Sequence, residues 1–511
     1  MLNEVSFELP EPAYADFTWV ISDEHTPVAA PPLTADQFAA RSNDDGVPRS
    51  LRINGFTYMR QDATPPGIPQ FPPGPLPSSR DQMRSWRTEW QPEVDKLIER
   101  LRGFDPESVP SGSWAATLEE QSREYWRVFG AVHRAAVLPA HAVGQRFQEL
   151  YLKRFGQARH SDGLALLQGI PNASLERAGL LWQASRVLHA DPALLEILDR
   201  GEALPESASA RQLQAAFDGL LQRFGCTSEG FVEDQPNWSE DPSVPLAAIL
   251  AYARLEDGRG PLDAADRQRI RRERLEAELR GLAPMDAASA DLVTIMEVAQ
   301  ELLPNLEDHN YYTDQCLSAA SRKRWLAIGR HLKRRDVVGA DDDVFYFYPP
   351  ELLLSLEGEA VLHRDVLNQR RQDLAAWRSV VPPPVLGRPP AELNQGSMGL
   401  RTSEMRMIHG VAASPGSYRG QARVIDSLAQ ASGLRRGDVL VCRATTPAWT
   451  PFFGVVSAIV TNTGGMLSHS AIVAREFAIP AVIGTVNGSA RIIDGATVTV
   501  DGTNGVVVVE D

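Results

Sequence analysis

The sequence predicts a multidomain α+β protein in which a mostly α-helical domain precedes a smaller C-terminal β/β/α domain. Three observations lead to this prediction. Apolar residues recur with helical spacing through residues 81–379, proline-rich stretches flank that region, and short apolar strands separated by glycine turns follow it. We therefore divide the chain into an N-terminal arm (1–80), a helical domain (81–379), a linker (380–408) and a C-terminal domain (409–511).

Size and composition limit the possible classes of protein. The 511 residues are enough for more than one core, and a net charge of −15 argues against nucleic acid or anionic membrane as the main partner. Because no signal peptide or membrane-spanning apolar stretch is visible, we expect a cytoplasmic protein. The three cysteines, Cys226, Cys316 and Cys442, lie far apart and are expected to be buried thiols rather than disulfides or metal ligands.

The N-terminal arm is expected to be irregular, because proline removes backbone donors and fixes φ. Its most proline-rich part is Thr64–Ser79, TPPGIPQFPPGPLPSS. Two interpretations fit this stretch. It is either a flexible connection or an extended arm that lies on the next domain through Ile68, Phe71 and Leu76.

The helical domain is predicted from apolar periodicity. In Asp291–Leu303, apolar residues follow the i, i+3, i+4, i+7 pattern of an amphipathic helix, and Pro304 ends it. Similar patterns predict helices at 114–155, 173–199, 209–224, 264–282 and 314–335.

The linker begins with a second proline-rich stretch, Val380–Pro390 (VVPPPVLGRPP), and continues through polar residues. If residues 380–408 were extended at about 3.1 Å per residue, they would reach roughly 90 Å. Such reach suits a domain that travels between distant sites, although a plain surface connection also fits the sequence.

The C-terminal domain is predicted from short apolar segments separated by turns. Strands are expected at 420–425, 438–443, 457–462, 480–484, 497–502 and 505–510, and helices near 427–432, 447–454 and 469–477.

The most informative segment of this domain is Thr461–Gly484, TNTGGMLSHSAIVAREFAIPAVIG. His469 lies between the pair Gly464 and Gly465 and the predicted start of a helix, for which Ser468 or Ser470 can serve as cap. The N–H groups at a helix N-terminus attract anions, and the glycines let a loop bring its amides close to one. This environment suits a phosphoryl group on an imidazole nitrogen.

The same segment closely resembles the phosphohistidine motif of the swivelling domain in enzymes related to phosphoenolpyruvate synthase and pyruvate phosphate dikinase, and every fixed place is filled from Thr463 to Gly484. The resemblance implies that His469 carries a phosphoryl group between two sites. It also implies that Thr463, Gly464, Gly465 and Ser468 support the phosphorylated loop. Arg475 either supports charge near His469 or pairs with Glu476 or a partner.

Two modules of such enzymes are not recognisable in this sequence: an ATP-grasp module and a pyruvate-binding barrel. We therefore expect ATP and Mg²⁺ on a separate ATP-grasp subunit, the acceptor on the helical domain, and no metal ion in this chain. A helical acceptor domain followed by a swivelling domain is similar to part of rifampin phosphotransferase and to the histidine-bearing subunits of phenylphosphate synthase and the hydroxyphenone kinases. The resemblance implies transfer from ATP through His469 to a small phenolic hydroxyl, with AMP and phosphate as products.

The acceptor pocket is expected around Leu306–Gln315 (LEDHNYYTDQ), which resembles a segment of the same families. His309 or a neighbouring carboxylate is a candidate base for the acceptor hydroxyl, and aromatic side chains suit a planar substrate. The candidate substrate-binding residues are Glu307, Asp308, Tyr311, Tyr312 and Trp238. The alternative is that these carboxylates are solvated helix-end charges and the aromatic residues belong to the core.

Two other functions remain open at the level of the sequence. The relay could serve an antibiotic or an aliphatic alcohol, or the chain could be a phosphohistidine carrier or regulatory module without a small-molecule acceptor. A helical domain of about 300 residues argues against a bare carrier.

Overall fold

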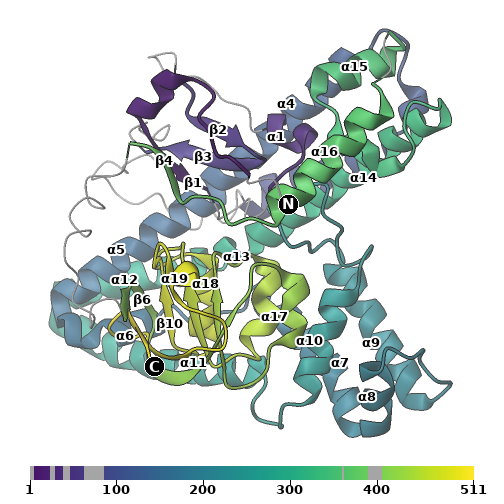
Figure 1. The fold of residues 1–511 in the computed structure, drawn as a ribbon. Helices are drawn as coiled ribbons and strands as arrows, with labels where there is room; N and C mark the ends of the chain where they lie inside the picture. Colours follow the sequence, from purple (N-terminus) through teal and green to yellow (C-terminus); the bar gives the residue numbers. More distant parts are fainter. Residues whose placement is uncertain are drawn as a thin grey trace.

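The computed structural model describes residues 5–22, 29–37, 47–61, 86–359, 362–388 and 406–510. These residues form a small N-terminal sheet, a large helical region and a C-terminal mixed sheet with short helices (Figure 1). The α+β class predicted from the sequence is confirmed. Within the described ranges, no helix has the length and apolar character needed to cross a membrane.

Helices fill most of residues 86–378, and the segments predicted as helical from their apolar period are largely helical. The α-helices of this region are α3 (Gln91–Arg102), α4 (Trp114–Val132), α5 (Leu138–Phe155), α6 (His160–Ala165), α7 (Ala173–Ala190), α8 (Pro192–Asp199), α9 (Ala208–Phe224), α10 (Ser243–Ala253), α11 (Pro261–Leu282), α12 (Ala287–Leu302), α13 (Asn305–His309), α14 (Cys316–Arg334), α15 (Pro349–Glu357) and α16 (Arg364–Arg378).

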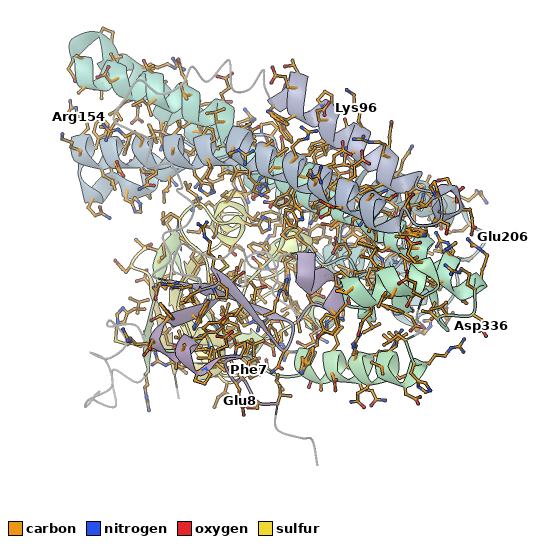
Figure 2. The ribbon with its side chains drawn as sticks, turned by 90° about the horizontal axis from the view of Figure 1, so that it is seen from above. Phe7, Glu8, Lys96, Arg154, Glu206 and Asp336 are labelled. Carbon is orange, nitrogen blue, oxygen red and sulfur yellow. A yellow bond between two sulfur atoms is a disulfide. The ribbon has the colours of Figure 1, made fainter. Side chains whose placement is uncertain are left out.

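Two long helices of this region each contain a π-helical turn. The first runs from α4 through the turn η4 (His133–Val137) into α5, and the second from α13 through η7 (Asn310–Gln315) into α14. In the view from above, the first helix, which ends near Arg154, crosses the width of the molecule (Figure 2). A π-turn changes which residues share a helix face, and such turns are frequent at functional sites.

The N-terminal arm was expected to be irregular, but the residues of it that the structure describes build an antiparallel sheet. Its strands, in the order β2-β3-β1-β4, are β2 (Ser50–Ile53), β3 (Phe56–Arg60), β1 (Thr18–Ile21) and β4 (Val385–Gly387). Asn54 and Gly55, both with positive φ, form the two-residue hairpin turn between β2 and β3. These strands are too short for a clear period-2 pattern, and the Thr64–Ser79 stretch lies outside the described residues.

Part of the predicted linker also belongs to this sheet. Residues of β4 pair with β1, and the Tyr58 hydroxyl donates a hydrogen bond to the carbonyl oxygen of Pro383 at 2.9 Å. The chain is therefore tied down as far as Arg388, whose N–H donates to the Phe17 carbonyl. The expected extended length of residues 380–408 is therefore too large, because residues up to Arg388 are held in the sheet. Residues 389–405 lie outside the described ranges.

The C-terminal domain is a mixed eight-stranded sheet in the order β5-β12-β11-β7-β8-β9-β10-β6, with β7, β8, β9 and β10 parallel. All six predicted strands are present, whereas β5 and β6 were not predicted from the sequence. The strands are β5 (Met407–His409), β6 (Val411–Ser414), β7 (Ser417–Val424), β8 (Asp438–Cys442), β9 (Ala458–Thr461), β10 (Ala481–Ile483), β11 (Thr497–Asp501) and β12 (Val506–Val509). The short helices are α17 (Thr450–Phe453), α18 (His469–Glu476) and α19 (Gly488–Arg491).

This domain is docked on the helical region, with α17 against α7 and α10, and α18 against α11 (Figure 1). One apolar core runs through both, because Trp449, Phe452 and Phe453 belong to the same cluster as Tyr252 of α10. Polar contacts complete the interface: the backbone N–H of Gly169 donates to both carboxylate oxygens of Glu476, at 3.1 and 2.9 Å.

The expectation that all three cysteines are free thiols is wrong for two of them. Cys226 and Cys316 form a disulfide with a Cα–Cα distance of 5.0 Å, within the range that a disulfide spans. Cys226 follows α9 and Cys316 begins α14, so their proximity depends on helix packing across 90 residues of sequence. Cys442 is a buried thiol in β8.

We predict that Gly387→Ala detaches β4 from β1. Gly387 has φ +72°, and a Cβ atom there would lie 2.3 Å from the Phe17 carbonyl oxygen. Left-handed backbone costs a non-glycine residue roughly 1–2 kcal/mol, and the clash adds to that cost. Hydrogen exchange at the amides of Ile21 and Arg388, which donate across this edge, should therefore accelerate.

Gly112→Ala is the matched control for this change, because Gly112 has φ +77° and no heavy atom within 4 Å of an added Cβ. It should destabilise the protein only through its left-handed backbone conformation and leave hydrogen exchange at the amides of Ile21 and Arg388 unchanged. Equal effects of the two variants on those amides would contradict the pairing of β4 with β1.

We predict that Glu476 makes the stability of the docked protein depend on pH. Burial raises the pKa of Glu476 from its ordinary 4.5 to about 7. The folded protein therefore holds a proton that the unfolded chain releases, and the associated stability, up to about 3 kcal/mol, is present below pH 4.5 and lost as pH rises through 7.

In Glu476→Gln the amide oxygen can still accept from Gly169, while the titrating charge is gone. Measured by thermal unfolding, the stability of the wild type relative to this variant should thus fall between about pH 5 and 8. Glu149→Gln changes an exposed carboxylate that lines the cavity, and its stability should depend on pH as that of the wild type does. If the stability of the wild type and of Glu476→Gln changed in parallel with pH, a raised pKa of Glu476 would be contradicted.

Candidate functional site

His469 is the first residue of α18, at the point predicted from the sequence. Strand β9 ends at Thr461, and the following loop turns back so that the N–H of Ile472 reaches the Ser468 carbonyl, at 3.0 Å, and closes the first helical turn. Gly464 has φ +117°, and a Cβ there would lie 2.9 Å from Ser468 Oγ. The loop therefore needs glycine at 464, and it places His469 at the positive end of the helix dipole.

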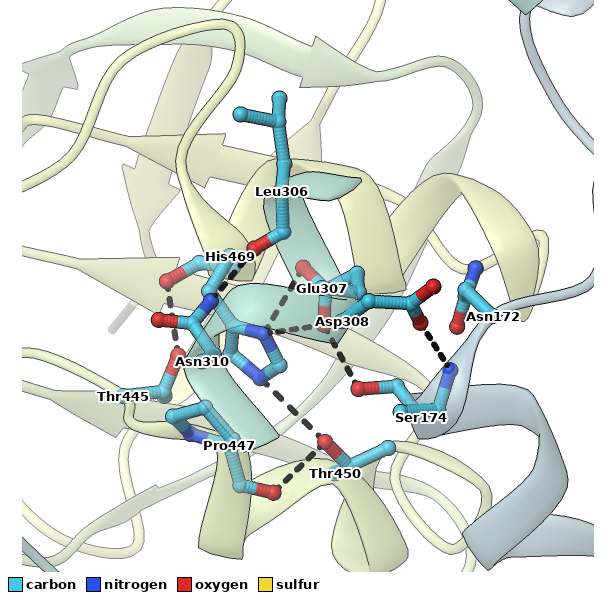
Figure 3. A network of polar contacts seen from close by, with 12 residues as sticks. Asn172, Ser174, Leu306, Glu307, Asp308, Asn310, Thr445, Pro447, Thr450 and His469 are labelled. Carbon is cyan, nitrogen blue, oxygen red and sulfur yellow. Dashed lines mark hydrogen bonds and ion pairs between the residues drawn. The ribbon is translucent and has the colours of Figure 1, made fainter. Parts of the chain in front are cut away.

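The imidazole of His469 is held from both sides (Figure 3). Its Nδ1 lies 2.9 and 3.1 Å from the two carboxylate oxygens of Glu307, and its Nε2 lies 3.3 Å from Thr450 Oγ1. The ring also contacts Phe453 edge-on, with centroids 6.3 Å apart. A carboxylate accepts only, so the contact with Glu307 places the proton on Nδ1 and leaves the lone pair of the neutral ring on Nε2.

Glu307 comes from α13 of the helical region and is almost fully buried. Burial by itself would raise its pKa, but the charge and hydrogen bond of His469, the hydroxyl of Ser174 and the charge of Arg177 together hold that pKa below its usual value. Ser174 Oγ donates to Glu307 at 2.6 Å. Glu307 is therefore a buried carboxylate that stays ionised opposite the histidine.

Arg177, on α7, is buried near this pair and joins the two domains. Its guanidinium donates to the Pro447 carbonyl at 2.6 Å and to Thr450 Oγ1 at 3.1 Å. Burial lowers its pKa to about 10, which still leaves it charged at neutral pH. The charge of Arg177 helps to lower the pKa of Glu307, and the charge of Glu307 raises the pKa of Arg177, so these two buried charges compensate each other.

A cavity of about 710 Å³ opens beside His469, between the helical region and the C-terminal domain. Its volume is in the range of sites for small organic ligands. His469 and Glu307 form part of its wall, and many other lining side chains are apolar: Val137, Leu152, Leu164, Leu167, Ile170, Phe231, Leu303, Leu306, Met466, Leu467 and Ile472. The structure thus brings the predicted phosphoryl carrier to a mostly apolar chamber.

The predicted substrate-binding residues separate into two groups. Glu307 lines the cavity, whereas Asp308, Tyr311, Tyr312 and Trp238 are not among the residues that line it. Asp308 accepts a hydrogen bond from the N–H of Ala173 at the start of α7, and burial raises its pKa to about 6.

The three aromatic candidates pack inside the helical region instead. Tyr311 contacts Phe224 and the Arg223 carbonyl, and Tyr312 contacts Arg223 and Trp86. Trp238 is buried against Arg177. Asp308, although next to Glu307 in sequence, points away from the cavity because successive residues of a helix lie about 100° apart around its axis.

The residues expected to support the phosphorylated loop all line the cavity. Thr463 fixes the loop through its N–H and hydroxyl, which both donate to the Arg443 carbonyl. Ser468 Oγ is buried without a hydrogen-bond partner in the part of the chain that is described. Arg475 donates to the Ala413 carbonyl at 2.9 Å, and burial lowers its pKa to about 10.

His309, the candidate base, lines the cavity but is directed into the helical region. Its Nδ1 contacts the Asn305 carbonyl at 2.9 Å, and its Nε2 lies 3.7 Å from Asp314. His133 faces the same carboxylate, and within the described ranges these three residues are a group whose ligand atoms could hold a metal ion.

Several residues of the site were missed in the sequence analysis. Arg177, Ser174 and Thr450 carry no local signal, since an arginine or serine in a helix and a threonine beside a proline are ordinary. They are recognisable as candidate site residues only because the fold places them around His469 and Glu307.

Comparison with known proteins agrees with this architecture. Residues 434–505 match the mobile domain of PEP-utilising enzymes, and residues 134–304 match the rifampicin phosphotransferase fourth domain. The two matched segments supply the His469 loop and much of the wall of the cavity.

Similar whole proteins include chondramide synthase cmdD of Chondromyces crocatus, 32% identical over 84% of this chain and 12% of that protein. The uncharacterised phosphotransferase YvkC of Bacillus subtilis is 29% identical over 74% of this chain and 47% of its own length. A rifampicin phosphotransferase of Streptomyces is 27% identical over 81% of this chain and 49% of its own length.

The chain spans about half the length of the two phosphotransferases and a smaller part of the synthase. The matches run through both the helical region and the C-terminal domain. The chain therefore combines a mobile domain of the PEP-utilising enzymes with a fourth domain of the rifampicin phosphotransferases.

Proposed function

We propose that this chain is the histidine-bearing, acceptor-binding part of an ATP-dependent phosphotransferase. In this proposal His469 receives a phosphoryl group at a nucleotide site and delivers it to the hydroxyl of a small molecule in the cavity, and AMP and phosphate are the other products. The observation that carries the proposal is the position of His469, at a helix N-terminus, facing Glu307 and opening on the cavity.

The contact with Glu307 selects the nitrogen that carries the phosphoryl group. Because Nδ1 holds its proton against the carboxylate, Nε2 is the nucleophile and forms the N–P bond. A phosphoimidazole protonated on Nδ1 leaves as neutral imidazole when the N–P bond breaks, whereas without that proton it would leave as an anion. Glu307 therefore makes the histidine a good leaving group.

The groups at the site account for each bond and proton in the transfer to the acceptor. The acceptor oxygen attacks phosphorus, the P–O bond forms as the P–N bond breaks, and the released Nε2 takes the hydroxyl proton. The resulting imidazolium is paired with the ionised carboxylate of Glu307. This route needs no separate base, so the role predicted for His309 is not required.

The cavity suits an apolar acceptor with at least one hydroxyl, and phenols are the class expected from the sequence. A second class, antibiotic-sized or aliphatic alcohols, is favoured by the names of several relatives, which are rifampicin phosphotransferases. Both classes would use the same transfer from His469. A pure carrier role is disfavoured by the cavity itself, because a carrier needs no chamber beside its histidine.

We also propose that the nucleotide, with its Mg²⁺, binds to a separate ATP-grasp subunit. His469 is enclosed in the docked arrangement, with its side chain 9% exposed, which supports a nucleotide site away from this cavity. A histidine enclosed in this way must leave its place to reach a nucleotide, which agrees with a mobile domain attached through residues that follow β4.

We predict that His469→Asn abolishes relay to any acceptor. The full chain would be phosphorylated with potassium phosphoramidate, a chemical donor that needs no nucleotide subunit, and then mixed with a panel of phenols and alcohols. Mass spectrometry and ³¹P NMR should show phosphate leaving His469 and an acceptor phosphoester appearing. Phosphate on the exposed His363 is the internal control and should not be discharged. Phosphoester formation by His469→Asn would overturn the proposal.

We predict that Glu307→Gln slows discharge of phospho-His469 to the acceptor by about 100-fold, because a neutral amide holds the Nδ1 proton less strongly than a carboxylate and so less of the ring can leave as neutral imidazole. The measurement is the single-turnover rate of acceptor phosphorylation after phosphoramidate treatment. Asp308→Asn is the matched control, since this neighbouring carboxylate caps α7 and does not line the cavity. An equal loss in both variants would show that Glu307 acts through the fold rather than on His469.

A further inference from the structure

Three potential metal ligands meet in the helical region at a place that the proposed reaction does not use. They are His133 at the end of the α4 stretch, His309 at the end of α13, and Asp314 in the turn η7. His133 Nε2 lies 3.8 Å from one carboxylate oxygen of Asp314, and His309 Nε2 lies 3.7 Å from the other. The three ligand atoms lie within 4.8 Å of one another.

The two imidazoles are oriented in the same way. His133 Nδ1 contacts the Phe129 carbonyl at 2.8 Å, and His309 Nδ1 contacts the Asn305 carbonyl at 2.9 Å. In the neutral ring a nitrogen that meets a carbonyl carries the proton, so the lone pair is on Nε2, the atom that faces Asp314. Metal-binding histidines are commonly fixed by such a contact between the other ring nitrogen and a backbone carbonyl.

Asp314 is the least satisfied of the three. Its side chain is 1% exposed, and neither carboxylate oxygen accepts a hydrogen bond within the described residues. Distances of 3.7 and 3.8 Å to the imidazole nitrogens are too long for hydrogen bonds. Ligands of a tetrahedral ion with bonds of about 2.1 Å are separated by roughly 3.4 Å, so the three ligand atoms, which lie within 4.8 Å of one another, would move closer together around an ion.

The π-turns create this arrangement. Residues five apart in an α-helix point about 140° away from one another, whereas a π-turn, with its i to i+5 hydrogen bonds, brings them onto one face. His309 and Asp314 are five residues apart across η7, and His133 is the first residue of η4. Both π-turns of the two long helices thus contribute directly to one side-chain cluster.

We propose that His133, His309 and Asp314 bind one divalent transition-metal ion. Two imidazole nitrogens and one carboxylate oxygen suit Zn²⁺, Co²⁺ or a similar ion, whereas Mg²⁺ prefers oxygen ligands alone. This assignment replaces the expectation that the chain holds no metal, and it removes His309 from the role of acceptor base because its Nε2 is a ligand.

Three protein ligands leave at least one coordination position for water or a ligand oxygen. His133 and His309 also line the cavity beside His469, so the proposed ion would lie next to that cavity. Use of that position by an acceptor oxygen rests on the proposed function. Binding of the ion itself does not depend on it.

Metal binding is tested on the full chain after removal of any affinity tag and of bound metal with EDTA. Zn²⁺ is added, excess is removed by dialysis, and bound metal is counted by elemental analysis. Titration with Co²⁺, followed by visible absorption, reports the ligand environment. The wild type should bind one equivalent, and Asp314→Asn and His133→Ala should weaken binding by about 100-fold or more.

His141→Ala is the matched control, because His141 lines the same cavity but is not in the cluster. It should bind metal as the wild type does. Circular dichroism and thermal unfolding check that the variants fold, and His133→Ala changes a side chain that is 24% exposed and so less critical to packing.

His469→Asn should retain the full metal equivalent, which separates failure of this proposal from failure of the relay. Sub-stoichiometric binding by the wild type, undiminished binding by folded Asp314→Asn, or equal losses in His141→Ala and His133→Ala would each overturn the metal site.

Discussion

The contact between His469 and Glu307 is the interaction on which the site depends. It joins two domains across 162 residues of sequence and determines the tautomer of the histidine. A buried carboxylate is costly unless charges and hydrogen bonds compensate it, and Glu307 has His469, Ser174 and the nearby Arg177 for this purpose. If the C-terminal domain leaves, as the proposed relay requires, the carboxylate loses the imidazole but keeps Ser174 and Arg177 of its own domain. In that proposal the acceptor side is prepared before the histidine arrives.

In the proposed relay, docking and departure of the C-terminal domain place opposite demands on the interface. Trp449, Phe452 and Phe453 belong to a core shared with the helical region, so separation exposes apolar surface at a cost of about 25 cal/mol per Å². A second docking surface must offset that cost, because a population shifts only by the difference in binding between two states. Such a surface would belong to the nucleotide-binding partner of the proposed relay.

The sequence was a good guide where structure follows from local pattern. The strands at 438–443 and 457–462 are short runs of apolar residues because parallel strands are buried on both faces, and β8 and β9 are buried almost throughout. It was a poor guide where a strand finds its partner far away. β4 was assigned to a linker because a three-residue strand has no period of its own, and it is a strand only because β1 supplies hydrogen bonds. The Cys226–Cys316 disulfide was missed for the same reason.

By itself the sequence determined the local structure around the proposed carrier, His469. The glycines, Ser468 and the apolar helix after His469 are neighbours along the chain, and their geometry follows from local φ, ψ and hydrogen bonding. Only the tertiary structure decided what surrounds that carrier. Helix packing brings Glu307 to His469 and Arg177 to the neighbouring Thr450. The cluster of His133, His309 and Asp314 depends on π-turns that apolar periodicity does not reveal. Contacts between distant residues are set by the packing of whole elements, which a local pattern does not encode.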